Sequence, residues 1–352
     1  MNIVPTPTGS GSSASHGKQG TGGSRDVFVP NWTEAMRTAI RSGAELARFL
    51  DLPQLPNPHR GGAEADFPVF VPRGFAEKME PGNPHDPLLR QVWPDVAETA
   101  SVQGFTDDPV GDLAATLRPG VLQKYHGRAL LVVSPACAIH CRYCFRRHFP
   151  YHEGPKGLTA WEEALTAIRA DMTIGEVILS GGDPLTVVDP MLRELVERIA
   201  AIPHVRRLRV HTRLPIVIPA RVTGDLIHWL TGTRLQGVMV VHANHPLEVD
   251  AEVLQALGKV RAAGVPVMNQ SVLLRGVNDD AETLIELSER LIDGGVLPYY
   301  LHQLDQVRGA AHFEVDRATG RQLIETMRAR LPGYGVPRYV EEIAGDVGKR
   351  VL

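Results

Sequence analysis

The sequence predicts an α/β fold, in which an incomplete (β/α)6 barrel follows a helical extension. After residue 126, six short apolar segments alternate with amphipathic stretches, which is the pattern of parallel strands covered by crossover helices. Polar residues or glycines end nearly every apolar segment, at 180–183, 211–213, 242–245, 269–271 and 302–305. A doubly wound sheet needs such residues only at its switch point, whereas a barrel gathers them from all its strands, so the pattern favours the barrel.

The amino-terminal part is predicted to be a tail followed by helices. Residues 1–27 are rich in Gly, Ser and Thr and lack the apolar stretch of a secretory signal, so we expect a disordered tail. Residues 28–125 form the predicted helical extension. Apolar residues recur at helical spacing from Trp32 to Leu52, and the Pro- and Gly-rich remainder predicts helices joined by long loops.

The predicted barrel occupies residues 126–335. Its six strands are the segments RALLVVS, EVILSGG, RLRVHTR, GVMVVHANH, PVMNQSVLL and PYYLHQLD. Amphipathic stretches such as WEEALTAIRAD, MLRELVERIAAI and AEVLQALGKVRAAG predict the covering helices. Residues 336–352 form a separate carboxyl-terminal segment in this prediction.

Composition and charge limit the class of protein. Hydrophobic residues make up 43% of the chain and charged residues 22%, as in soluble globular proteins. The net charge of -3 gives no electrostatic footprint for nucleic acid or an anionic membrane, and no apolar run is long enough to cross a bilayer. Three cysteines cannot form a disulfide framework and indicate a reducing compartment, so we expect a cytoplasmic protein.

All three cysteines lie in one loop, CAIHCRYC, after the first predicted strand. Cys137, Cys141 and Cys144 could hold a metal ion or a cluster through their thiolates. A zinc site would close with a fourth ligand, for which His140 or His148 is at hand, whereas a cluster with three protein ligands leaves one iron for a substrate. The residues alone leave the zinc site and the cluster both open. In either case the loop could also be structural, in a protein without enzymatic activity.

The spacing C-x3-C-x2-C, with Tyr143 before the last cysteine, resembles the signature of the radical S-adenosylmethionine (SAM) superfamily. The string LSGGDPL after the second strand is similar to the glycine-rich motif that receives the SAM amino group in that superfamily. The resemblance implies a radical SAM partial barrel, with a 4Fe-4S cluster on the three cysteines and SAM on its open iron. The SAM-contacting residues that it implies are Ser180, Gly181, Gly182, Asp183, His242 and Gln270.

Longer strings resemble the lysine 2,3-aminomutases, and in particular their shorter branch, which makes β-lysine for modifying elongation factor P. The likeness includes CRYCFRRHFPY, RLPIVIPAR, NQSVLLRGVND and GAAHF, and it covers about residues 65–349. The reaction that it implies moves the amino group of L-lysine from Cα to Cβ. It also implies pyridoxal 5'-phosphate (PLP) as a second cofactor and an external one-electron reductant.

The resemblance assigns PLP contacts as well. Lys349 matches the lysine that holds the PLP aldehyde, so residues 336–352 become a PLP-anchoring segment. A lysine in this role must lose its proton, which requires a sheltered or cationic environment. The expected neighbours of the PLP phosphate are Arg128, Lys124 and Tyr125.

Three further residues match substrate contacts of the family. Arg146 matches the group that binds the substrate carboxylate, and a guanidinium suits that planar pairing. Asp305 and Glu342 match two carboxylates that bind the substrate's side-chain ammonium group. Two acids in one cavity repel each other unless a cation lies between them, so the pair predicts a basic amino acid.

Several alternatives remain at this level. The same fold would serve an arginine or glutamate 2,3-aminomutase, and a zinc or iron–sulfur module without activity is the alternative from another class. Glu342 stands where free-lysine enzymes have Asp, a change shared with the shorter branch, which implies a functional link to an elongation factor P ligase. GDVGK replaces the all-glycine run before the lysine, and the sequence allows a homo-oligomer without indicating one.

Overall fold

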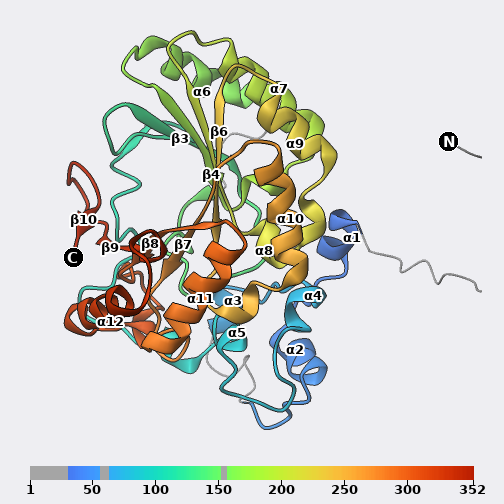
Figure 1. Ribbon diagram of the computed structural model, residues 1–352, viewed down its shortest axis with the longest axis vertical. Helices are drawn as coiled ribbons and strands as arrows, with labels where there is room; N and C mark the ends of the chain where they lie inside the picture. The colour runs from blue at the N-terminus through green and yellow to red at the C-terminus, as the bar shows by residue number, and fades with distance from the viewer. Residues whose placement is uncertain (1–30, 56–62, 152–156) are drawn as a thin grey trace, which may run out of the picture.

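The computed structural model describes residues 31–55, 63–151 and 157–352 (Figure 1). The tail predicted for residues 1–27 lies outside the described residues. A single ten-stranded sheet forms the centre of the described part, and its strands lie in chain order from β1 to β10.

The six predicted strands are all present, and each pairs in parallel with the next. They are β3 (Arg128–Ser134), β4 (Glu176–Gly181), β5 (Arg207–Thr212), β6 (Gln236–His242), β7 (Val267–Val272) and β8 (Leu297–His302). Within the described residues, β1 and β10 are the two ends of the strand order, so the sheet is not closed into a full barrel. The predicted partial barrel is therefore confirmed.

Four short strands extend the sheet beyond the prediction: β1 (Thr116–Arg118), β2 (Val121–Leu122), β9 (Arg338–Glu341) and β10 (Arg350–Val351). β2 pairs antiparallel with β3, β9 pairs parallel with β8, and β10 pairs antiparallel with β9. The expectation of helices and loops alone before residue 126 misses the β1–β2 hairpin. Strands of two or three residues leave no periodicity in a sequence, which is why the pattern did not indicate them.

Helices cover the outer side of the sheet, as the amphipathic stretches predict (Figure 1). The longer ones are α6 (Leu158–Ala170), α7 (Asp189–Ala200), α9 (Gly224–Thr231), α10 (Ala251–Ala262), α11 (Ala281–Asp293) and α12 (Arg317–Arg330). Side-chain caps define several of their starts. Asp280, for example, accepts a hydrogen bond of 2.9 Å from the backbone N–H of Thr283 at the start of α11.

Strand β4 shows how the sheet divides its residues between two faces. Val177 and Leu179 are fully buried in the core that joins the sheet to the outer helices. Ile178 and Ser180 point the other way and line a cavity on the inner face. Since side chains alternate along a strand, each strand contributes one set of residues to the core and another to the cavity.

The front of the chain forms short helices beside the mouth of the barrel (Figure 1). They are α1 (Trp32–Arg37), α2 (Gly43–Phe49), α3 (Ala63–Asp66), α4 (Arg73–Ala76), α5 (Pro87–Arg90) and the 3-10 helix η1 (Val96–Thr99). Backbone hydrogen bonds join this helical part of the chain to the cysteine loop. The N–H of His140 donates to the carbonyl of Phe70 at 3.0 Å, and the N–H of Arg142 donates to the carbonyl of Gln91 at 2.8 Å.

Replacing Glu98 with glutamine is expected to lower the free energy of unfolding by about 3 kcal/mol, since breaking a buried ion pair leaves an uncompensated charge. The Glu98 carboxylate is buried against two arginines of the cysteine loop, with N–O distances of 2.5 Å to Arg142 and 2.7 Å to Arg147. Denaturant unfolding measures the loss. Glu45→Gln is the control, because the Glu45–Arg73 pair is exposed and should contribute about 1 kcal/mol or less. Equal losses in both variants would contradict the prediction.

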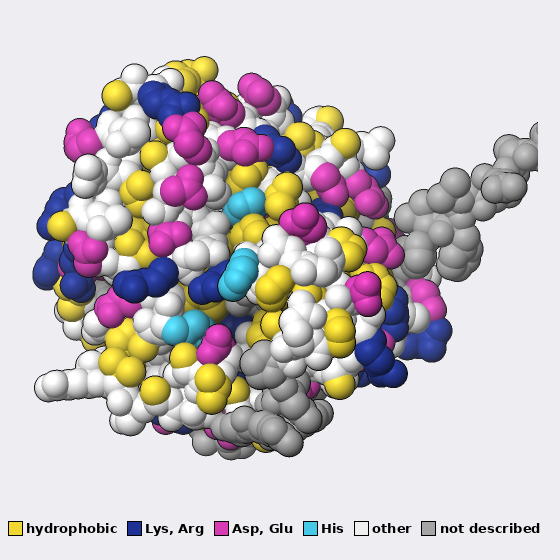
Figure 2. Space-filling view, turned by 90° about the horizontal axis from the view of Figure 1, so that it is seen from below, with side chains coloured by type: hydrophobic (Ala, Val, Ile, Leu, Met, Phe, Trp, Pro, Cys, Tyr) yellow, Lys and Arg dark blue, Asp and Glu magenta, His cyan; other side chains and the backbone are white. Residues whose placement is uncertain are grey.

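The surface carries charges of both signs. Figure 2 shows Lys and Arg side chains mixed with Asp and Glu on the face seen there, without a large area of one sign. No helix among the described residues is both long and apolar enough to cross a membrane.

Candidate active site

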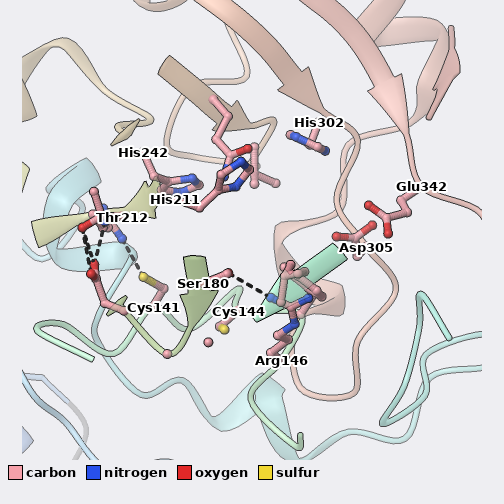
Figure 3. Close-up of a pocket in the computed structure, with 18 of the residues that line it drawn as sticks. Cys141, Cys144, Arg146, Ser180, His211, Thr212, His242, His302, Asp305 and Glu342 are labelled. Atoms are coloured by element: carbon pink, nitrogen blue, oxygen red, sulfur yellow. Dashed lines mark hydrogen bonds between the residues drawn. The ribbon is translucent and has the colours of Figure 1, made fainter. Parts of the chain in front are cut away.

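A cavity of about 320 Å³ lies on the inner face of the sheet, at the carboxyl ends of its parallel strands. Every residue that the resemblance assigns to the cluster, SAM, PLP or the substrate lines this cavity, and several of them are labelled in Figure 3. His140 and His148, the candidate fourth ligands of a zinc site, do not line it. The structure therefore brings together residues from position 124 to position 349. Their separate roles stay predictions.

The cysteine loop follows β3 and borders the cavity. Cys137, Cys141 and Cys144 are all free thiols. Burial, together with the neighbouring thiols, raises the pKa of Cys144 to about 11 and that of Cys137 well above its usual value. Thiolates this sheltered and this close repel one another, so they need a cation among them.

The donor set fits an iron–sulfur cluster. The three thiols come from one loop and border the same cavity. A cubic cluster spreads three thiolates over three irons, and three cysteines around one cavity suit that arrangement.

The glycine-rich turn packs directly on the cysteine loop. Gly181 has a φ of 126° and Gly182 follows it; a Cβ atom would lie 2.5 Å from the Ser134 carbonyl oxygen at the first and 2.4 Å from the Ala136 oxygen at the second. Only glycine fits such close approaches. The N–H of Gly182 donates to Ser134 at 2.8 Å, which ties the end of β4 to the loop that carries the cysteines.

Asp183 ends this turn and joins it to the next strand. Its carboxylate accepts hydrogen bonds from the hydroxyl of Thr212 at 2.8 Å and from the backbone N–H of Arg213 at 2.7 Å. Burial raises the pKa of Asp183, although these hydrogen bonds oppose the shift. Its side chain thus orders the ends of β4 and β5, and a SAM contact by this residue stays a prediction.

A chain of alternating charges crosses the opposite part of the cavity. Glu342 accepts hydrogen bonds from the ammonium groups of Lys349 and, at 2.7 Å, Lys124. Lys124 also lies 2.6 Å from Asp112, whose other oxygen lies 2.5 Å from Nε of Arg146. The predicted PLP lysine and the predicted carboxylate-binding arginine are therefore linked through three intervening groups.

Asp305 lies beside Glu342, as Figure 3 shows. Burial and the nearby Glu342 raise the pKa of Asp305 to about 7. Burial would also raise the pKa of Glu342, but Lys349 and Lys124 outweigh it and lower that pKa to about 2. The two acids therefore differ: Glu342 is already neutralised by lysines, and Asp305 is short of a cation.

Two histidines, the buried His302 and the partly buried His211, line the same cavity and were not among the predicted site residues. Burial keeps the pKa of His211 and of His302 well below the usual value, so both rings are neutral. Nε2 of His211 is buried without a hydrogen-bond partner in the described part of the chain. Their positions at strand ends were the one available signal, since nothing else in the sequence sets them apart.

Asp112 was also missed. It lies in the predicted helical extension, within DPVGDL, where no periodicity or motif marks a site. Its side chain is almost fully buried between Lys124 and Arg146. Only the folded chain shows that this loop supplies the acid between two of the predicted binding residues.

The side chains near the start of β3 also suit the binding of an anionic group. The Arg128 guanidinium lies 4.8 Å from the centre of the Tyr125 ring, and both residues line the cavity with Lys124. Nε of Arg128 is buried without a hydrogen-bond partner among the described residues. An unpaired buried donor on a cation fits a phosphate oxygen.

Comparison with known proteins is consistent with this site. A family model described as a 4Fe-4S single cluster domain matches residues 126–207, which include the cysteine loop and the glycine-rich turn. The L-lysine 2,3-aminomutase of Haemophilus influenzae is 45% identical to this chain, over 91% of the chain and 94% of that protein.

Two further relatives carry the same name. The L-lysine 2,3-aminomutase of Escherichia coli is 46% identical, over 92% of this chain and 94% of its own length. That of Clostridium subterminale is 32% identical, over 92% of this chain and 79% of its own length. Each of these relatives is at least 32% identical over more than nine-tenths of this chain, and so the chain belongs to the L-lysine 2,3-aminomutase family.

Proposed function

We propose that this protein is a radical SAM, PLP-dependent isomerase that converts L-lysine to β-lysine. The observation that carries the proposal is the pair Asp305 and Glu342, which shares one cavity with the three cysteines and Lys349. Asp305 is short of a cation in a place that the carboxylate of Glu342 makes more negative. The side-chain ammonium group of lysine supplies such a cation.

Three groups of residues would hold the cofactors. Cys137, Cys141 and Cys144 would bind the 4Fe-4S cluster, and the turn at 180–183 with His242 and Gln270 would surround SAM. Lys349 would anchor PLP, whose phosphate would lie against Arg128, Lys124 and Tyr125. With these groups bound and the cluster reduced by an external one-electron donor, they would supply a carbon radical that abstracts hydrogen and an aldehyde that carries the migrating nitrogen.

The protein's own share is to bind, orient and shelter the substrate. Arg146 is fixed by Asp112 through Nε and by Ser180, whose hydroxyl lies 3.3 Å from Nη1, so its guanidinium is preorganised for a carboxylate. At the other end, Asp305 and Glu342 meet the ammonium group. A reactive radical also needs a site without bulk water, and the walls of the cavity would shelter it.

The two carboxylates in the cavity favour lysine over glutamate as the substrate. A glutamate side chain would place a third carboxylate beside Asp305 and Glu342, at a cost of several kcal/mol for like charges brought together. Arginine carries the right charge but a longer, planar head group. Lysine is the substrate that the pair favours, and arginine is the one to test against it.

The proposed destination of the product is elongation factor P. Support comes from the resemblance to the shorter branch of the family, which includes Glu342, and from the identity of 45% and 46% to the Haemophilus and Escherichia proteins against 32% to the clostridial protein. A functional link to a ligase that attaches β-lysine follows from the same resemblance. A cytoplasmic location would suit both the reduced thiols and this partner.

Anaerobic assay of the reconstituted protein tests the proposal. The protein receives iron, sulfide, PLP, SAM and a reductant, with lysine, arginine or glutamate in separate reactions, and mass spectrometry identifies the β-amino acids. We expect β-lysine, formed only when both SAM and PLP are present. Activity on glutamate alone would refute the role of Asp305 and Glu342, and a colourless zinc-containing protein would refute the cluster.

A further inference from the structure

Arg213 is the first residue after β5 and touches the cysteine loop. Its backbone N–H is fixed by Asp183, and its side chain is buried, with 7% of its surface exposed. Nη1 donates a hydrogen bond to Sγ of Cys141 at 2.7 Å, one of the dashed contacts in Figure 3. The same nitrogen donates to the hydroxyl of Tyr143 at 2.7 Å. A permanent positive charge thus lies against a predicted cluster ligand.

Other groups hold this guanidinium in place. Nη2 donates to Oε1 of Gln91 at 2.7 Å and to Oε2 of Glu248 at 2.8 Å, and both partners are fully buried. The guanidinium carbon lies 5.8 Å from the centre of the Tyr143 ring. With Nη2 bound on one side and Nη1 on the other, Arg213 cannot turn away from Cys141 without breaking buried hydrogen bonds.

The other arginines near the cysteines have different partners. Arg142 and Arg147 share the carboxylate of Glu98, and Arg146 pairs with Asp112. Arg213 also has an acid, Glu248, but that acid lies at Nη2 while Nη1 faces the sulfur. The positive end of the Arg213–Glu248 pair is therefore directed at the cluster site.

We propose that Arg213 is a positioning residue that raises the reduction potential of the cluster; this rests on the cluster of the proposed function. Reduction transfers one electron from an external one-electron donor to the cluster and makes the cluster and its thiolates more negative by one charge. A fixed cation that donates a hydrogen bond to a ligand sulfur stabilises the reduced form more than the oxidised form. Arg213 would thereby make reduction easier before any substrate reacts.

The test is a potentiometric titration of the reconstituted protein followed by electron paramagnetic resonance. Arg213→Gln should shift the reduction equilibrium about tenfold toward the oxidised cluster, which corresponds to about 59 mV for one electron. Arg213→Lys keeps the charge and should recover part of that shift. Iron and sulfide contents equal to those of the unchanged protein show that the cluster is intact in each variant.

Arg221→Gln is the matched control, because Arg221 is fully buried and paired with Asp189 but does not line the cavity. It should leave the midpoint potential unchanged. Since Arg213→Gln is also destabilising, Glu248→Gln gives a second reading: loss of the opposing acid should raise the potential. An unchanged potential in intact Arg213→Gln protein, or an unchanged or lower one in Glu248→Gln, overturns the inference. Failure of the unchanged protein to take up any cluster would overturn the proposed function instead.

Discussion

Replacing Lys349 with alanine is expected to abolish the conversion of lysine to β-lysine and to leave part of the reductive SAM cleavage intact. Lys349 lines the cavity and donates a hydrogen bond to Glu342, and it is not among the residues proposed to hold the cluster or SAM, so its loss should not disturb either group. The measurement is twofold: β-lysine by mass spectrometry, and 5'-deoxyadenosine by chromatography. Product formation should fall by at least a thousandfold, since PLP without its anchoring lysine would not be held in place to bond the substrate nitrogen.

Lys349→Arg is the matched variant for this prediction. It keeps a positive charge beside Glu342, which accepts a hydrogen bond from Lys349, but a guanidinium cannot form the bond to the aldehyde. We expect it to be as inactive as the alanine variant. Activity in Lys349→Arg would mean that the charge alone matters, and equal loss of product and of SAM cleavage in Lys349→Ala would mean that Lys349 is not specifically the PLP anchor.

Much of the fold could be predicted because the barrel repeats a local pattern. The strand β4 with its terminal Ser180 and Gly181 is one apolar run with polar residues at its end, and the same unit recurs along the chain. A parallel sheet then places all strand ends at one edge, so the cysteines, the glycine-rich turn and Asp305 could be expected to meet. The alternation of strands and helices and the topology of a parallel sheet were therefore enough to predict the barrel and the meeting of these residues.

The remainder depends on contacts between distant segments. Asp112 takes its place only because the loop before β1 folds over the barrel and meets Lys124 and Arg146. The link from Arg213 to Cys141 joins two different strand–helix units, and nothing in either segment alone indicates it. Strand β9 lies in a segment that the resemblance assigned to PLP anchoring, and its four residues are too few for a periodic signal.

Replacing Asp305 with asparagine is expected to lower kcat/KM for lysine about a hundredfold, because truncating one side of a charge pair costs about 2–5 kcal/mol and each 1.4 kcal/mol is a factor of ten. The pH dependence should change with it. The pKa of Asp305 is about 7 in the ligand-free protein, so the carboxyl is neutral at lower pH and its attraction for the ammonium group is lost there. The unchanged protein should therefore show KM rising as the pH falls below about 7.

The asparagine variant should lose that pH dependence, since it has no carboxyl to titrate. The stability of the asparagine variant should rise, whereas its activity should fall. The raised pKa means that the folded protein holds a proton on Asp305 that the unfolded chain releases near pH 4, so ionisation of Asp305 destabilises the fold as the pH rises from about 4 to 7. Asp305→Asn should thus be more stable than the unchanged protein at pH 8 while being far less active.

Asp107→Asn provides the control for the KM measurement and for its pH profile. Asp107 is exposed and pairs with Arg308, outside the cavity, so neither KM nor its pH profile should change. A loss of activity in Asp305→Asn that is accompanied by a loss of stability would point to a structural role. A gain in stability with a large rise in KM has one physical explanation: Asp305 is held partly buried beside Glu342, at a cost to the ligand-free fold, because the substrate's cation is what it binds.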